Sequence, residues 1–149
     1  MTIRRAGFTM LEMLFVVVIG GIVLAIGTRQ YSQLSNQRAV GNASNAMVHT
    51  ASRARSEAMR SGRVIYLRIR PDLAQVRVRS ASDSAIHTLD AGADGVSITG
   101  STISICYAAR GYALPGCTSI SGTQTVNFVR GVDTATVQVL PLGQVRRTR

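Results

Sequence analysis

The sequence contains no lysine, although it is strongly basic. All 17 of its basic residues are arginines, against 7 acidic residues, which gives a formal net charge of +10. Two interpretations stay open. A genome-wide preference for arginine codons produces this composition, and so does selection for an anionic partner, because the planar guanidinium fork matches the geometry of phosphate and carboxylate groups.

Cysteine is scarce as well. Only Cys106 and Cys117 occur, both in the C-terminal half of the chain. Such a pair often forms a disulfide on the oxidising side of a membrane, whereas cytosolic cysteines usually stay reduced. A bridge would stabilise the enclosed loop by about 2–3 kcal/mol, and two free thiols are the alternative.

Recognisable catalytic and metal-binding patterns are missing. No serine lies in a Gly-x-Ser-x-Gly elbow, and no nucleophile has a recognisable base. His49 and His87 lack the spacing of metal ligands, and the segment 90–95 lacks the middle ligand of a calcium loop. We therefore predict that the chain is not an enzyme and binds no metal or cofactor.

The most prominent feature is a long apolar segment, residues 8–28, behind a short basic leader, residues 1–7. A helix rises about 1.5 Å per residue, so the segment spans about 31 Å. A bilayer hydrocarbon core is about 30 Å thick, which predicts a membrane-spanning helix. Arg4 and Arg5 precede it, so we expect the leader in the cytoplasm and the rest outside.

Two other classes of N-terminal segment also fit this pattern. A cleaved secretory signal ends in small residues, and Ala25-Ile26-Gly27 is a candidate cleavage site. A plain signal anchor fits the length. Neither class explains Glu12, because an ionisable group within a membrane helix is costly and usually functional.

The segment Gly7-Phe8-Thr9-Met10-Leu11-Glu12 resembles the cleavage and methylation motif of type IV prepilins. The resemblance implies that a prepilin peptidase cuts between Gly7 and Phe8 and methylates the new amino group of Phe8. It also implies that Glu12 pairs with the amino terminus of a neighbouring subunit in a filament. A carboxylate buried among apolar side chains is tolerated when it is paired in this way.

The same resemblance implies a location and a set of partners. We expect a single-pass protein of the bacterial inner membrane, with a cytoplasmic N-terminus and a periplasmic head. The implied partners are other pilin or pseudopilin subunits, the prepilin peptidase and the inner-membrane assembly platform.

The helix is expected to continue beyond the membrane. No proline occurs between Phe8 and Arg70. Apolar or small residues recur at steps of mostly three and four, which predicts an amphipathic stem over residues 29–62 that ends at Ser61-Gly62. The predicted stripe is Tyr31, Leu34, Ala43, Met47, Ala51, Ala54 and Ala58.

The segment 53–58, followed by Val64-Ile65-Tyr66-Leu67, resembles the stem-to-strand junction of the GspH/FimT family. This family comprises H-type minor pseudopilins of type II secretion and FimT-like minor pilins. The resemblance implies a structural subunit of a secretion pseudopilus that acts in protein secretion. The alternatives are a FimT-like minor pilin that binds DNA during uptake, and a signal-anchored periplasmic domain that forms no filament.

The remainder, residues 63–142, is predicted to be a β-rich head. Arg63–Arg70 alternates between apolar and polar residues, and a turn at Pro71-Asp72 leads to a second alternating segment, which is typical of a hairpin. Further strands are expected at Ser101–Tyr107, Gln124–Arg130 and Thr134–Leu140. The expected fold is α+β and pilin-like, with a long N-terminal helix packed on an antiparallel sheet.

Arginines are concentrated at two places in the head. The first set, Arg68, Arg70, Arg77 and Arg79, is expected on the exposed face of the hairpin. Like charges that face each other across strands are destabilising, which favours an anionic partner, and a solvated basic face is the alternative. The second set, Arg146, Arg147 and Arg149, lies in the basic tail, residues 143–149.

The tail partly resembles the Gly-Arg-x-Arg motif that is associated with DNA binding in FimT-like minor pilins. Gln144 replaces the first arginine of the motif, and Arg146 matches the second. A flexible basic tail binds phosphates in a salt-sensitive and sequence-independent way.

Overall fold

The computed structural model describes residues 9–82 and 84–148. The predicted cleavage site between Gly7 and Phe8 lies outside the described residues, as does Arg149. The chain divides into two compact units, residues 1–35 and 36–149. Helix α1 (Met10–Ser61) contributes residues to both.

The first unit contains the N-terminal part of α1. Thr9 caps the helix, because its Oγ1 and its carbonyl oxygen accept hydrogen bonds from the Glu12 N–H at 3.3 and 3.1 Å. Threonine is a favoured residue at this position. By length and composition, α1 is able to cross a membrane.

The second unit contains the C-terminal part of α1, which buries one face. Val40, Ala43, Met47, Ala51, Ala54 and Ala58 are buried there. Their spacing of three and four residues places them along one stripe, as in an amphipathic helix. The predicted stripe is therefore confirmed from Ala43 onward. Tyr31 and Leu34, the first two residues of the predicted stripe, are exposed and belong to the first unit, so the buried part of the stripe does not include them.

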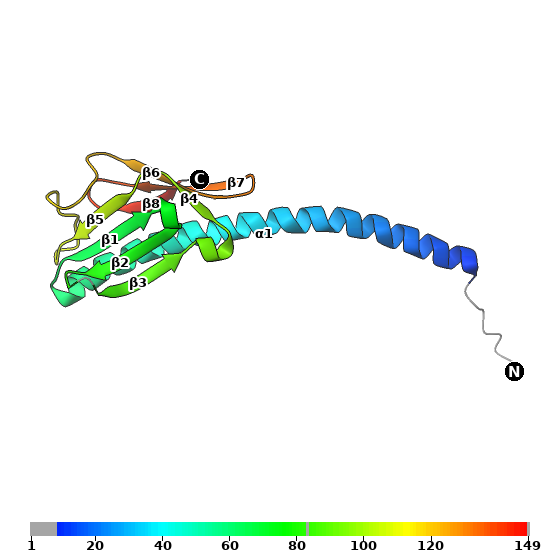
Figure 1. The fold of residues 1–149 in the computed structure, drawn as a ribbon, viewed down its shortest axis with the longest axis horizontal. Helices are drawn as coiled ribbons and strands as arrows, with labels where there is room; N and C mark the ends of the chain where they lie inside the picture. Colours follow the sequence, from blue (N-terminus) through cyan, green and yellow to red (C-terminus); the bar gives the residue numbers. More distant parts are fainter. Residues whose placement is uncertain (1–8, 83, 149) are drawn as a thin grey trace, which may run out of the picture. The chain divides into compact units, whose positions relative to one another are not determined.

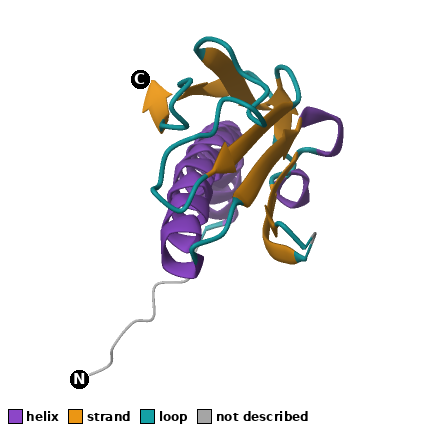
Figure 2. Cartoon of the chain, turned by 90° about the vertical axis from the view of Figure 1, so that its left-hand side faces the viewer, coloured by secondary structure: helices purple, strands orange, loops and turns teal. Residues whose placement is uncertain are grey.

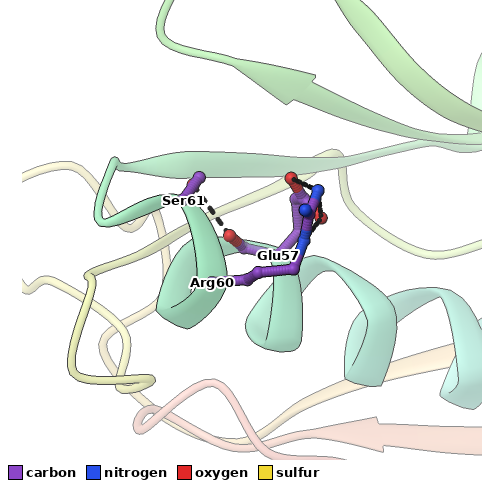
Figure 3. A network of polar contacts seen from close by, with 3 residues as sticks. All are labelled: Glu57, Arg60 and Ser61. Carbon is purple, nitrogen blue, oxygen red and sulfur yellow. Dashed lines mark hydrogen bonds and ion pairs between the residues drawn. The ribbon is translucent and has the colours of Figure 1, made fainter.

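Helix α1 ends where the sequence predicts. Gly62 adopts the left-handed conformation, with φ of +67°, and its N–H donates to the Ala58 carbonyl at 3.1 Å. Glycine is favoured at this position of a helix end because it has no Cβ. In the last turns, the Arg60 guanidinium pairs with the Glu57 carboxylate at 2.8 Å and Ser61 Oγ donates to the Glu57 carbonyl at 2.7 Å (Figure 3).

Two antiparallel four-stranded sheets complete the second unit (Figure 1). The first sheet has the order β3-β2-β1-β5 and the second has the order β4-β6-β7-β8. The strands of the first sheet are β1 (Ile65–Arg70), β2 (Gln75–Ser80), β3 (Ala85–Asp90) and β5 (Ile103–Tyr107). Those of the second are β4 (Ser97–Thr99), β6 (Gln124–Arg130), β7 (Asp133–Val139) and β8 (Val145–Thr148). Short 3₁₀ helices, η1 (Pro71–Leu73) and η2 (Gly92–Asp94), lie between strands.

Alternating apolar residues direct one face of each sheet into a common core. In the first sheet, Leu67 pairs with Val78 and with Ile105, and all three side chains are fully buried. In the second sheet, Phe128 and Val137 are fully buried. These residues and the buried stripe of α1 form one hydrophobic cluster. Figure 2 shows the strands of the second unit gathered beside the helix. The expected α+β fold, a long helix packed on antiparallel sheet, is confirmed.

Three of the strands, β3, β4 and β8, were not predicted from the sequence. Strand β3 lies at the edge of its sheet and its apolar residues are only partly buried, so its alternation is weak. Strand β4 is only three residues long. Strand β8 begins with its single apolar residue, Val145, which is followed by two arginines and a threonine.

The prediction of a flexible tail is wrong for Val145–Thr148. These residues form β8, which pairs with β7 through the register Val145↔Val139. A turn at Gly143, with φ of +79°, returns the chain, and the Leu140 N–H donates to the Gln144 carbonyl at 2.8 Å. Buried Tyr107 of β5 donates its hydroxyl to the Gly143 carbonyl at 2.7 Å, which ties this turn to the first sheet.

We predict that Tyr107→Phe destabilises the head by about 1–3 kcal/mol at neutral pH, because the Gly143 carbonyl loses its buried donor. Burial raises the pKa of Tyr107 to about 12, against a smaller lowering by Arg55. The unfolded tyrosine ionises first, so the stability contributed by the neutral phenol is present below pH 10 and is lost as the pH rises toward 12.

Denaturation of the full-length protein in uncharged detergent, followed from pH 7 to 12, measures both effects. Because the chain has no lysine, no ammonium side chain titrates in this window. The wild type should lose stability between pH 10 and 12 more steeply than Tyr107→Phe, and equal slopes would contradict the assignment.

Candidate functional site

The first candidate site is an apolar surface on the N-terminal part of α1 that carries one carboxylate. Every large apolar side chain from Met10 to Ile26 is exposed, including Leu11 and Met13 on either side of Glu12. Glu12 lies in the first helical turn, where a negative charge interacts favourably with the helix dipole. Among the described residues of this chain, the Glu12 carboxylate forms no ion pair.

This arrangement has a direct physical consequence. An apolar surface of this extent requires cover by lipid or by other protein, since contact with water is unfavourable. Covering it also transfers Glu12 out of water, which is costly unless a cation meets the carboxylate. The partner predicted from the sequence is the amino group of Phe8 of a neighbouring subunit.

The second candidate site is the outer face of the first sheet, which we call the basic face. The register places Arg68 of β1 directly opposite Arg77 of β2, and Tyr66 opposite Arg79. On its other side, Arg68 lies opposite Ser104 of β5. The structure therefore brings the four predicted hairpin arginines together around a surface hollow of about 370 Å³. Its lining includes Tyr66, Arg68, Arg70, Arg77, Arg79 and Ser104.

Two arginines of the basic face, Arg70 and Arg77, form polar contacts with neighbouring side chains. Arg70 Nη2 lies 2.8 Å from Asp72 Oδ2, and this hydrogen bond holds the pKa of the Asp72 carboxyl below its usual value. Arg77 donates through Nε and Nη2 to Gln75 Oε1, at 3.1 and 2.8 Å. Arg68 forms no hydrogen bond or ion pair through its side chain within residues 9–82 and 84–148.

The tail arginines are arranged differently. Arg146 and Arg147 are consecutive residues of β8, and consecutive side chains of a strand point to opposite faces of the sheet. Arg146 lies opposite Gln138 and donates to its Oε1 at 3.5 Å, whereas Arg147 lies opposite Val137. The strand therefore separates the two arginines that a flexible tail would have presented together.

A disulfide joins Cys106 of β5 to Cys117 in the following loop. The loop also bonds to the edge of β5, because the Ser119 N–H donates to the Ser104 carbonyl and the Ser104 N–H donates to Ser119 Oγ, both at 2.9 Å. The bridge thus holds a loop against the edge strand that borders the basic face. The two cysteines are recognisable in the sequence, but nothing in their spacing places them beside this face.

No group of three or more histidine, cysteine or acidic side chains suited to a metal ion occurs within the described parts of the chain.

Comparisons with known proteins agree with the first candidate site. Residues 3–28 match the family model described as the prokaryotic N-terminal methylation motif. The fold is similar to two crystal structures of the type IV minor pilin FimU from Pseudomonas aeruginosa, in different crystal forms, each at 15% sequence identity. In the first, the TM-score is 0.54 and the match covers 74% of this chain and 88% of FimU; in the second, the values are 0.53, 73% and 92%. The chain thus combines a prepilin-type N-terminal methylation motif with a pilin-like fold. No curated protein matches it in sequence.

The match to the methylation motif covers Gly7, Phe8 and Glu12. Their individual roles in cleavage, methylation and assembly stay predictions.

We predict that Arg68→Gln stabilises the head at low ionic strength, because it removes a like-charge pair across β1 and β2. The expected gain is about 0.2–1 kcal/mol, and it should shrink as added salt screens the repulsion.

Thermal denaturation of the full-length protein in uncharged detergent, at low and high salt, measures this gain. Arg53→Gln, at an exposed position on α1, removes the same charge away from the basic face and serves as the control. An equal gain in both variants would show that net charge, and not the cross-strand pair, is responsible.

Proposed function

We propose that this prepilin-like protein is a minor subunit of a type IV filament, of the GspH/FimT kind. The observation that carries the proposal is the position of Glu12 within the exposed apolar part of α1 and inside the matched methylation motif. The similarity of the fold to FimU, which is described as a type IV minor pilin, supports it.

The proposed assembly begins with removal of the leader, residues 1–7. A prepilin peptidase cuts between Gly7 and Phe8 and methylates the amino group of Phe8. Until assembly, α1 anchors the subunit in the inner membrane with its N-terminus in the cytoplasm and its head in the periplasm. The inner-membrane assembly platform then transfers the helix from lipid to the filament core.

Within the filament, the side chains of neighbouring helices replace lipid around the apolar surface from Met10 to Ile26. The positively charged Phe8 amine of one subunit lies beside the Glu12 carboxylate of the next. The pairing offsets the desolvation of both charges and fixes the axial position of one helix against another. The role is structural, and the subunit catalyses no step.

Two machines use subunits of this kind. The sequence of the stem-to-strand junction resembles H-type pseudopilins, which favours a type II secretion pseudopilus and a role in protein secretion. The similarity of the fold to the type IV minor pilin FimU favours a pilus. DNA binding through the tail is weakened as an alternative, because β8 directs Arg146 and Arg147 to opposite faces of the sheet. The non-filament alternative leaves the methylation motif without a role.

We predict that Glu12→Gln is inserted and processed but is at least about tenfold depleted in filaments, because the neighbouring amine then lacks its counter-charge in an apolar core. The measurement is the amount of subunit that copurifies with sheared filaments or crosslinks to other filament subunits, relative to the amount in the membrane.

Glu57→Gln is the matched control, since it removes a carboxylate from the same helix, where that group pairs with Arg60. The control should assemble normally. Recovery of Glu12→Gln in filaments at the wild-type level would contradict the proposed pairing.

A further inference from the structure

The basic face contains a lateral row of polar side chains that the filament proposal does not use. Across three strands of the first sheet, Arg77 of β2, Arg68 of β1 and Ser104 of β5 lie directly opposite one another. Their neighbours along the strands, such as Leu67 and Val78, are buried, so alternation places the row on the outer face. Two arginines in direct register repel each other, and the sheet keeps them together despite this cost.

The two guanidinium groups differ in how they are held. Arg77 is positioned, because Gln75 Oε1 accepts two of its N–H bonds while Gln75 Nε2 donates to Asp90 Oδ2 at 3.1 Å. Two of the five guanidinium N–H donors of Arg77 are used in this way, and the other three are not used by Gln75. All five donors of Arg68 are available, since no described residue accepts from its side chain.

The charges around the hollow decide which ligand it suits. The described residues that line the hollow include four arginines and no acidic side chain, and the nearby Asp72 carboxylate is paired with Arg70, so the lining offers donors and positive charge to a ligand. Guanidinium groups bind tetrahedral oxyanions through two parallel hydrogen bonds, and a phosphate group offers several strong acceptor oxygens and a charge close to −2. A hollow of about 370 Å³ exceeds one phosphate group and leaves room for the moiety that carries it.

We propose that the basic face is a binding site for a phosphate group, in which Arg68 and Arg77 share the oxyanion and the Ser104 hydroxyl donates a further hydrogen bond. The site is independent of filament assembly, because Glu12 and the apolar part of α1 contribute nothing to it. The bound phosphate neutralises the repulsion between the two arginines, which gives the like-charge register a function.

The test is a calorimetric titration of the full-length protein, in uncharged detergent, with inorganic pyrophosphate. The wild type should bind it saturably. Arg68→Gln and Arg77→Gln should each weaken binding by about tenfold or more, as expected for loss of charge-assisted hydrogen bonds. Arg53→Gln, which makes the same change in net charge away from the hollow, should bind within about twofold of the wild type.

Folding does not confound this comparison, because removal of one arginine of the opposed pair is expected to stabilise the sheet, and a thermal melt of each variant checks this. The absence of saturable binding by the wild type would overturn the proposal. Equal weakening by Arg53→Gln would also overturn it, since it would reveal general attraction to a protein of net charge +10.

A second titration identifies the source of the phosphate. Arg68-dependent binding of pyrophosphate but not of a dinucleotide phosphodiester indicates a free or terminal phosphate. Arg68-dependent binding of both indicates that the site also accepts internal phosphates of a chain. Binding that Arg68→Gln leaves unchanged for both probes would reject the site.

Discussion

One constraint governs how this protein can be accommodated: a carboxylate lies on a helical surface that is otherwise apolar. The side chains from Met10 to Ile26 require a cover that excludes water, and any such cover also excludes water from Glu12. Lipid provides the apolar contacts but no counter-charge. A neighbouring subunit whose chain begins with a charged amine provides both, because its own apolar helix accompanies the amine. In the proposed filament, the carboxylate that is costly in lipid therefore favours transfer of the helix into a bundle of like helices.

Helix α1 meets two different environments along one continuous element. In the first unit its apolar residues are large and exposed on all sides. In the second unit its buried stripe consists mainly of alanines, with Met47 and Val40, so strands can approach the helix closely. The change from large to small side chains along α1 thus separates a surface suited to partners from a surface that belongs to the head's own core.

The sequence predicted those elements whose signal is local and strong. The helix end at Ser61-Gly62 follows from a glycine that adopts φ of +67°, and β1 and β2 follow from the alternation of apolar and polar residues. Strand β8 was missed because its pairing depends on groups outside the tail: Val139 of the adjacent strand β7, and Tyr107, which donates to the Gly143 carbonyl. No pattern within 143–149 contains that information, and its arginines favoured a flexible tail.

The sequence likewise predicted some features of the candidate sites, whereas others required the structure. Glu12 was recognised because its position relative to the apolar segment is a property of the sequence itself. The grouping of the hairpin arginines was predicted by alternation, but their register was not, since only strand pairing shows that Arg68 faces Arg77 and also Ser104. The positioning of Arg77 by Gln75 and Asp90 spans separate strands and required the structure.

The most direct test of the central claim is the N-terminal residue of the mature protein. Mass spectrometry and N-terminal sequencing of the protein extracted from membranes identify it. If a neighbour's amine pairs with Glu12, the mature chain begins at N-methylated Phe8 and retains the whole apolar segment. A mature chain that begins at Thr28 would contradict the account, because Glu12 would then be discarded with a cleaved signal peptide.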